Sequence, residues 1–150
     1  FRLTVSRLVV SRARSGNQKD YVAVMDERTR FLCEGPNFAA LTTLFADGDP
    51  QNQIMWVGCD EEHVLINTEI HRAKYRNVER DARVSVAIWD AADPYSYVEV
   101  RGRVVETVGG DAARADIDAL AQKYMGKDYP NPVTSERVVL KIAIDRELIH

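Results

Sequence analysis

The sequence predicts a mainly β protein of the α+β class, an antiparallel barrel of about six strands with two or three peripheral helices. Most of the expected strands follow one another through short polar turns, which is typical of antiparallel connections. One expected strand contains Gly102, and a glycine inside a strand favours the bend that closing a barrel requires. The alternating strand–helix pattern of a parallel sheet is absent from the sequence.

Six segments have the length and hydrophobic pattern of strands. Asp47-Gly48 marks a hairpin turn between the first two, and we expect the first three to form an antiparallel meander. In the fifth, Val98, Val100 and Gly102 alternate with charged residues, so one face should be buried. The expected strands are Phe38–Phe45, Gln51–Cys59, Val64–Thr68, Val84–Trp89, Tyr95–Thr107 and Arg137–Ile144.

Helix signals separate these strands. Asp26 is a suitable N-cap for a short helix in which Phe31 and Leu32 face inward. A second helix, roughly Arg72–Arg80, should link the third and fourth strands. Asp111 is the expected cap of a third helix, whose apolar residues fall on one side. These residues are Ala113, Ile117, Leu120, Ala121 and Tyr124.

The length of 150 residues suits one domain with a sizeable core. We expect residues 25–150 to form that domain and residues 1–24 to be a loosely ordered extension, partly strand at Leu3–Val10. Cys33 and Cys59 show no metal-ligand spacing, and we interpret both as reduced thiols. The sequence has no stretch that could span a bilayer and no signal-peptide pattern near its start, so we expect a cytoplasmic location.

Several classes of function find no support in the sequence. A net charge of −3 gives no reason to expect nucleic-acid or membrane partners. The glycine-rich phosphate motifs and the Gly-x-Ser-x-Gly nucleophile motif are missing, and His63, His71 and His150 lack metal-ligand spacing. We therefore assign no catalytic residue and no metal ligand. If the protein is an enzyme, a cofactor should carry the reactivity and a small molecule should be the substrate.

The turn after the third expected strand gathers the groups that bind phosphate. Asn67 and Thr68 end the strand, and Arg72, Lys74 and Arg76 follow within a few residues. Charged and N–H donors that converge at a helix start favour an anion. One regular element cannot point all three cations into one site, so we favour Arg72 and Lys74, with Arg76 more peripheral.

An ordinary solvated helix face is the alternative to a phosphate site. In that interpretation, Arg76 and Arg80 pair with Glu79 and Asp81. The charge pattern leaves both interpretations open.

The sequence resembles the split β-barrel flavin and deazaflavin oxidoreductases, which include pyridoxamine 5′-phosphate oxidase and actinobacterial coenzyme F420-dependent enzymes. The resemblance covers about Glu34 to Ile144, and the helix Asp111–Met125 is similar to the F420 branch. It rests on GPNFAALTTLFADGDPQ (35–51), VLINTEIHRAKYRNVERDARVSVAIWD (64–90), DPYSYVEVRGRVVE (93–106), ERVVLKI (136–142) and KDYP (127–130).

The resemblance implies a six-stranded split barrel, a homodimer, and a cofactor groove at the subunit interface. It assigns the cofactor phosphate to Arg72 and Lys74, with Asn67 and Thr68 at the preceding strand end. It assigns the cofactor ring to Gln53, Ile54 and Met55, with Tyr95 or Tyr97 contributed by the partner subunit. Glu69 departs from the family pattern, and an acid that faces inward there would weaken an anion site.

The cofactor implied is F420, with FMN as the alternative, because both present a ring, a ribityl chain and a phosphate. The implied activity is a reductase that transfers a hydride from reduced F420 to an organic acceptor. An FMN-dependent oxidoreductase and a non-enzymatic carrier of a cofactor or pigment remain alternatives.

Overall fold

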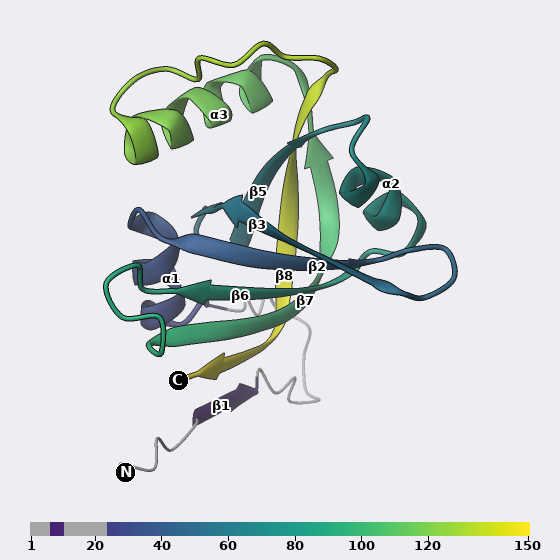
Figure 1. The fold of residues 1–150 in the computed structure, drawn as a ribbon. Helices are drawn as coiled ribbons and strands as arrows, with labels where there is room; N and C mark the ends of the chain where they lie inside the picture. Colours follow the sequence, from purple (N-terminus) through teal and green to yellow (C-terminus); the bar gives the residue numbers. More distant parts are fainter. Residues whose placement is uncertain (1–6, 11–23) are drawn as a thin grey trace, which may run out of the picture.

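The computed structural model describes residues 7–10 and 24–150; the rest of the predicted N-terminal extension lies outside them. The described chain contains three helices and eight strands (Figure 1). The helices are α1 (Glu27–Glu34), α2 (Ala73–Arg80) and α3 (Gly110–Met125). The strands are β1 (Arg7–Val10), β2 (Phe38–Leu44), β3 (Pro50–Trp56), β4 (Gly58–Cys59), β5 (His63–Glu69), β6 (Arg83–Trp89), β7 (Tyr97–Val108) and β8 (Arg137–Ile149).

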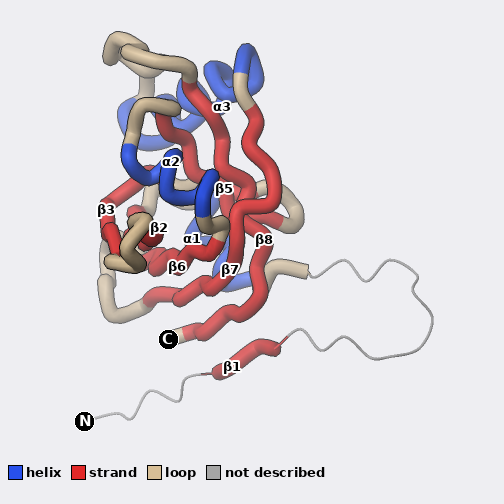
Figure 2. Tube along the Cα trace, turned by 90° about the vertical axis from the view of Figure 1, so that its right-hand side faces the viewer, coloured by secondary structure: helices blue, strands red, loops and turns tan. Residues whose placement is uncertain are grey.

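One antiparallel sheet contains all the described strands. Seven of them follow the order β3-β2-β6-β7-β8-β5-β4, and β1 pairs with the far end of β8. The long strands β7 and β8 run side by side and join the two halves of the sheet (Figure 2). The prediction of a mainly β, antiparallel split barrel is therefore confirmed. β1 lies within the segment 3–10 that is predicted to be partly strand, and β4 is the end of the predicted strand Gln51–Cys59.

The predicted meander of the first three strands is correct for the β2–β3 hairpin, but the predicted second strand is divided into β3 and β4, and only its short second part pairs with β5. β5 pairs with β4 and β8, whereas β3 lies at the opposite edge of the sheet. The chain turns a corner at Val57, where side chains of α3 replace strand pairing. The Val57 N–H donates to Tyr124 Oη at 3.2 Å, and the Val57 carbonyl accepts from Lys123 Nζ at 2.5 Å. No local sequence pattern indicates these hydrogen bonds, because they join residues that are far apart in the chain.

Gly102 produces the predicted bend. The register between β7 and β8 shifts between Arg101 and Gly102. A Cβ atom at Gly102 would lie 2.0 Å from the carbonyl oxygen of Ala143, so no other residue fits against β8 there. β8 continues past the predicted end at Ile144 because its last residues pair with both β7 and β1.

Helix α1 begins as predicted, with the Asp26 carboxylate accepting from the Arg28 N–H at 2.8 Å. Its buried side chains include Leu32 and Cys33, but Phe31 is 60% exposed, so the predicted inward position of Phe31 is wrong. Phe31 packs instead under the Arg28 guanidinium, 5.1 Å from its ring centroid. Both cysteines, in α1 and β4, are free thiols.

Helix α3 covers one end of the sheet, beside β5 and the start of β8 (Figure 1). Its predicted cap at Asp111 is wrong: Gly109 is the N-cap, and Asp111 lies in the first turn, where an acid favours the helix dipole. A Cβ atom at Gly109 would meet Glu136 Oε1 at 2.5 Å. The predicted apolar side is confirmed, since Ala113, Ile117, Leu120 and Ala121 are buried and Tyr124 stacks on Trp56.

Candidate functional site

The basic turn joins β5 to α2 at the end of the sheet that α3 covers. The Arg72 N–H donates to the Glu69 carbonyl at 3.0 Å, and the Ile70 N–H donates to the Glu136 carbonyl at 3.0 Å. These two bonds hold the start of α2 beside the start of β8. Arg72 is the N-cap of α2, and its side chain makes no capping bond, so the first N–H groups of the helix are left without a side-chain cap.

Lys74 is the most unusual residue of the turn. It is 7% exposed, yet within the described residues its ammonium has no hydrogen bond and no ion pair. Burial lowers the pKa of Lys74, and the charges of Arg72 and Arg137 lower it further. The ammonium is not cut off from solvent. A buried cation without a partner costs stability, which is the property expected of a group that serves a ligand.

The arginines of α2 are exposed, but they do not form the ion pairs that the solvated-face alternative names. Arg76 donates from Nη1 to the His71 carbonyl at 2.8 Å, and Arg80 donates from Nη2 to the Leu44 carbonyl at 2.6 Å. Asp81 pairs with Arg83 at 2.7 Å. The two arginines thus hydrogen-bond to the backbone of the turn and of the β2–β3 hairpin. Neither forms an ion pair with Glu79 or Asp81.

The two predicted strand-end residues point in opposite directions. Thr68 shares the face of β5 that carries Ile66 of the hydrophobic core. Asn67 faces α3, where its amide nitrogen donates to the Ala113 carbonyl and to Asp116 Oδ2, both at 2.9 Å. Both hydrogens of this amide are therefore occupied within the protein.

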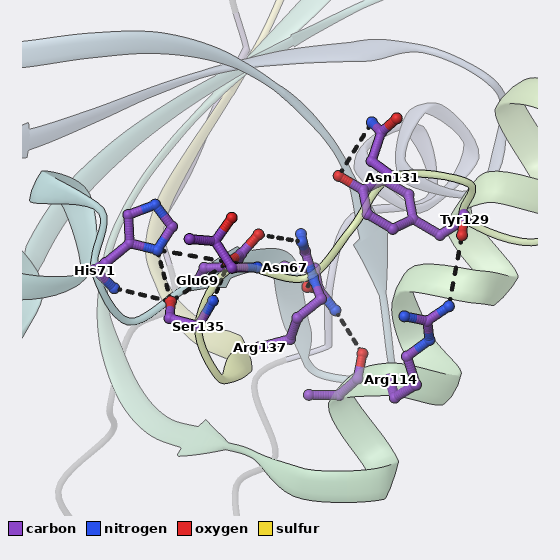
Figure 3. Close-up of polar contacts among 10 residues, drawn as sticks. Asn67, Glu69, His71, Arg114, Tyr129, Asn131, Ser135 and Arg137 are labelled. Carbon is purple, nitrogen blue, oxygen red and sulfur yellow. Dashed lines mark hydrogen bonds and ion pairs between the residues drawn. The ribbon is translucent and has the colours of Figure 1, made fainter.

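Glu69 is buried inside a ring of donors (Figure 3). Its Oε2 accepts from the N–H of Ser135 at 2.7 Å, and its Oε1 accepts from Arg137 Nη1 at 3.1 Å. Burial alone would raise the pKa of the Glu69 carboxyl, but the Ser135 N–H and the Arg137 guanidinium outweigh it and lower that pKa. The charge of Glu69 is therefore satisfied by donors of the 134–137 segment, and the expected harm to an anion site does not arise.

Arg137 is the site residue that sequence reasoning missed. Its Nε donates to Asn67 Oδ1 at 2.7 Å, and its guanidinium lies 4.9 Å from the centroid of the Tyr129 ring (Figure 3). In the sequence, Arg137 stands out only as a cation at the first position of the predicted last strand. Recognising its role required the knowledge that β8 pairs with β5, which puts Arg137 opposite Glu69.

Ser135, His71 and Glu69 also meet here, but not as a catalytic triad. The same ring nitrogen, His71 Nδ1, lies 2.6 Å from Ser135 Oγ and 3.5 Å from Glu69 Oε2. A triad needs one ring nitrogen for the nucleophile and the other for the acid. These contacts hold the 134–136 loop against the turn instead.

The three residues predicted to line the cofactor ring do not share a face. Met55 and Gln53 lie opposite Ala39 and Leu41, which are buried, so both belong to the inner face of β3. Ile54 belongs to the outer face and is 61% exposed. Gln53 is exposed although it lies on the inner face of β3, which is an edge strand of the sheet.

Helix α2 meets the same inner face. Asn77 donates to Thr43 Oγ1 at 3.0 Å and to Gln51 Oε1 at 3.1 Å. Lys74 is one turn earlier on the buried side of α2. The structure therefore brings Lys74 and the inner face of β3 to one region of the barrel, from segments about twenty residues apart in sequence.

Residues 7–10 and 24–150 contain no group of three or more His, Cys, Asp and Glu side chains arranged to hold a metal ion. None of the described helices has both the length and the apolar character needed to cross a membrane.

The described chain folds into a split barrel made of a single sheet, with several cations at one end. These two features define the class of protein. A family model described as Pyridoxamine 5'-phosphate oxidase matches residues 25–150, and the chain belongs to that family. The structure is similar to that of an F420 reductase, with 30% identity, a TM-score of 0.69, and coverage of 79% of this chain and 94% of that chain.

Two further structures share the fold at lower identity. A conserved hypothetical protein from Mycobacterium tuberculosis is 21% identical, with a TM-score of 0.64 and 89% coverage of each chain. General Stress Protein 26 from Bacillus anthracis is 20% identical, with a TM-score of 0.61 and coverage of 82% of this chain and 92% of that chain.

Proposed function

We propose that the protein is an oxidoreductase that uses reduced coenzyme F420 to reduce a small organic acceptor. The observation that carries this proposal is Lys74, a buried cation that has no partner within the described residues and is placed at a helix start. Family membership and the similarity to an F420 reductase support the same function.

The residues of the basic turn fit the phosphate of such a cofactor. An anion would satisfy the Lys74 ammonium and the free N–H groups at the start of α2, which lack a side-chain cap. Arg72 and Arg76 are exposed beside them, available to further negative charge on the same ligand. We assign the direct contacts to Lys74 and Arg72, and we place Asn67 behind them.

The inner face of β3 is the candidate surface for the cofactor ring. Met55 packs against the core and gives that surface an apolar floor, while Gln53 is open to solvent beside it. When bound, a reduced deazaflavin supplies the hydride. The protein then needs to orient the two reactants and limit water rather than supply an acid or a base.

FMN is the alternative cofactor, because its phosphate would satisfy the same groups. The family description favours this alternative as a class, whereas the most similar structure reported above is named an F420 reductase. Yellow colour with flavin absorbance in the purified protein would select FMN.

We further propose a cytoplasmic homodimer in which the partner subunit completes the site. Two large side chains that are exposed in this chain support it: Tyr95 is 89% exposed and Ile54 is 61% exposed. Tyr97 is less available, because its ring stacks on His150 at 4.3 Å. Light scattering coupled to size-exclusion chromatography should give twice the mass of the chain, and a monomer that still binds cofactor would contradict this part.

Direct titration tests the main proposal. Purified protein titrated with F420 and, separately, with FMN should bind F420 at micromolar concentration and more tightly than FMN. The bound reduced cofactor should then be oxidised when a quinone or conjugated carbonyl is added. Absence of F420 binding at micromolar concentration would refute the F420 assignment.

A further inference from the structure

The guanidinium of Arg137 is held rigidly at the edge of the proposed phosphate site. Its side chain is 10% exposed, and Asn67 and Glu69 each accept one of its N–H groups, at 2.7 and 3.1 Å. The Tyr129 ring covers one face of the guanidinium plane at 4.9 Å. Three contacts, two from β5 and one from the loop after α3, thus fix the direction in which this side chain points (Figure 3).

One nitrogen of this group has no partner. In the described part of the chain, Nη2 of Arg137 makes no hydrogen bond and no ion pair, although Nε and Nη1 both do. It is not sealed from solvent. A guanidinium carries its donors in a planar fork, so fixing Nε and Nη1 also fixes the direction of the Nη2 donors.

Arg137 and Lys74 are also near each other. The Ile70 N–H bond to the Glu136 carbonyl anchors the residue before Arg137 to the turn that starts α2. The charge of Arg137 contributes to the lowered pKa of Lys74, so the two cations lie within electrostatic reach. Two buried cations that each keep a donor free are expected to repel each other until an anion joins them.

We propose that Arg137 is a further ligand of the anion that Lys74 binds, and that Asn67 and Glu69 are the positioning residues that aim its free Nη2. The ligand class is a phosphate ester carried by a flavin or deazaflavin, so this inference rests on the proposed function. It also explains Glu69, whose carboxylate orients a cation instead of opposing the ligand.

Paired ligands with and without phosphate test this proposal. FMN and riboflavin form one pair, and F420 and its riboflavin-like core without the phosphate-bearing tail form another. In Arg137→Met, the affinity for FMN and F420 should fall by about tenfold or more, the loss expected for a charge-assisted hydrogen bond. The affinity for riboflavin and for the deazaflavin core should stay within about twofold of the wild-type value.

Arg137→Lys and Arg101→Lys complete the experiment. Arg137→Lys keeps the charge but loses the fork, and it should lose part of the affinity for the phosphate-bearing ligands only. Arg101 is exposed on β7 and pairs with Glu99, so Arg101→Lys should change neither ligand pair.

Each remaining outcome overturns a specific claim. If the affinity for both members of a pair is unchanged, or falls equally, in the Arg137 variants, Arg137 does not bind the phosphate, and the proposal fails while the function stands. If the wild type binds neither FMN nor F420, the proposed function fails, and this inference fails with it. Thermal melting of Arg137→Met identifies a variant that is unfolded, in which case the same criterion is applied to Arg137→Lys.

Discussion

The two ends of β8 each bury a glutamate, and they treat its charge in opposite ways. Near the start of β8, Glu69 is surrounded by backbone N–H donors and Arg137, and its pKa is lowered. Near the end of β8, Glu147 accepts from the Asp26 N–H, at 3.2 Å to each of its oxygens, and burial raises the pKa of the Glu147 carboxyl.

The difference shows where the barrel concentrates positive charge. At the Glu147 end, the nearby Asp26 carboxylate adds to the effect of burial on the Glu147 pKa. At the Glu69 end, the acid is fully compensated, and Lys74 and one nitrogen of Arg137 still remain without partners in the described chain. Among the described residues, the Glu69 end therefore keeps buried positive charge without a partner, whereas Glu147 is buried without an ion pair.

Removal of the Glu69 carboxylate should give the largest effect on stability. Glu69→Ala leaves the Arg137 guanidinium buried with its ion pair broken, and breaking a buried pair costs about 3–5 kcal/mol of unfolding free energy. Urea denaturation of the variant and the wild type measures this cost.

Glu147→Ala is the matched control. It removes an acceptor for one N–H group but no ion pair, so its cost should stay within about 1 kcal/mol. Equal losses in the two variants would show that the two ends of β8 do not differ in the way described.

The pH dependence of stability should separate the two glutamates next. A carboxyl with a lowered folded pKa stabilises the protein above its ordinary pKa, and this contribution is lost as the pH falls through the folded value. The difference between wild type and Glu69→Gln should therefore shrink as the pH falls below the ordinary glutamate range.

The contribution of Glu147 to stability changes with pH in the opposite direction. Because its folded pKa is raised, its favourable contribution is complete below the ordinary pKa and is lost as the pH rises through the folded value. Glu147→Gln should gain stability relative to wild type over that rise. Thermal melts from about pH 2 to about pH 8, roughly the range in which shifted carboxyls titrate, would contradict the comparison if both variants followed the same profile.

The smallest expected effect concerns His71. Its side chain is 42% exposed, and its Nδ1 lies 3.5 Å from Glu69 Oε2. Exposed ion pairs contribute about 0–1 kcal/mol, so His71→Ala should lower the unfolding free energy by less than about 1 kcal/mol. A larger loss in urea denaturation would mean that His71, rather than Arg137, compensates Glu69.

Local signals predicted much of the fold. The Asp47-Gly48 turn, the Asp26 cap and the bend at Gly102 each depend on the conformation or space of a single residue, and the sequence shows them directly. The corner at Val57 depends on Lys123 and Tyr124, more than sixty positions away, and no local pattern indicates it.

The candidate site divides in the same way. Lys74 and Arg72 stand out as cations at a turn, but the burial of Lys74 and its lack of a partner are properties of the packed structure. In the sequence, Asn67 looks available to a ligand. The partners of its amide on α3 lie 46 and 49 positions further along the chain, so no local pattern reveals them. Arg137 was missed because its pairing with Glu69 spans 68 positions.

Titration of Lys74→Met with F420 and FMN tests the central claim most directly, with Lys127→Met, a change of an exposed lysine, as the control. The account predicts that Lys74→Met weakens binding by about 1.5–3 kcal/mol, the strength of a hydrogen bond to a charged group, without lowering the melting temperature. Lys127→Met should bind as the wild type does. Unchanged cofactor affinity in Lys74→Met would contradict the claim that this end of the barrel binds the phosphate.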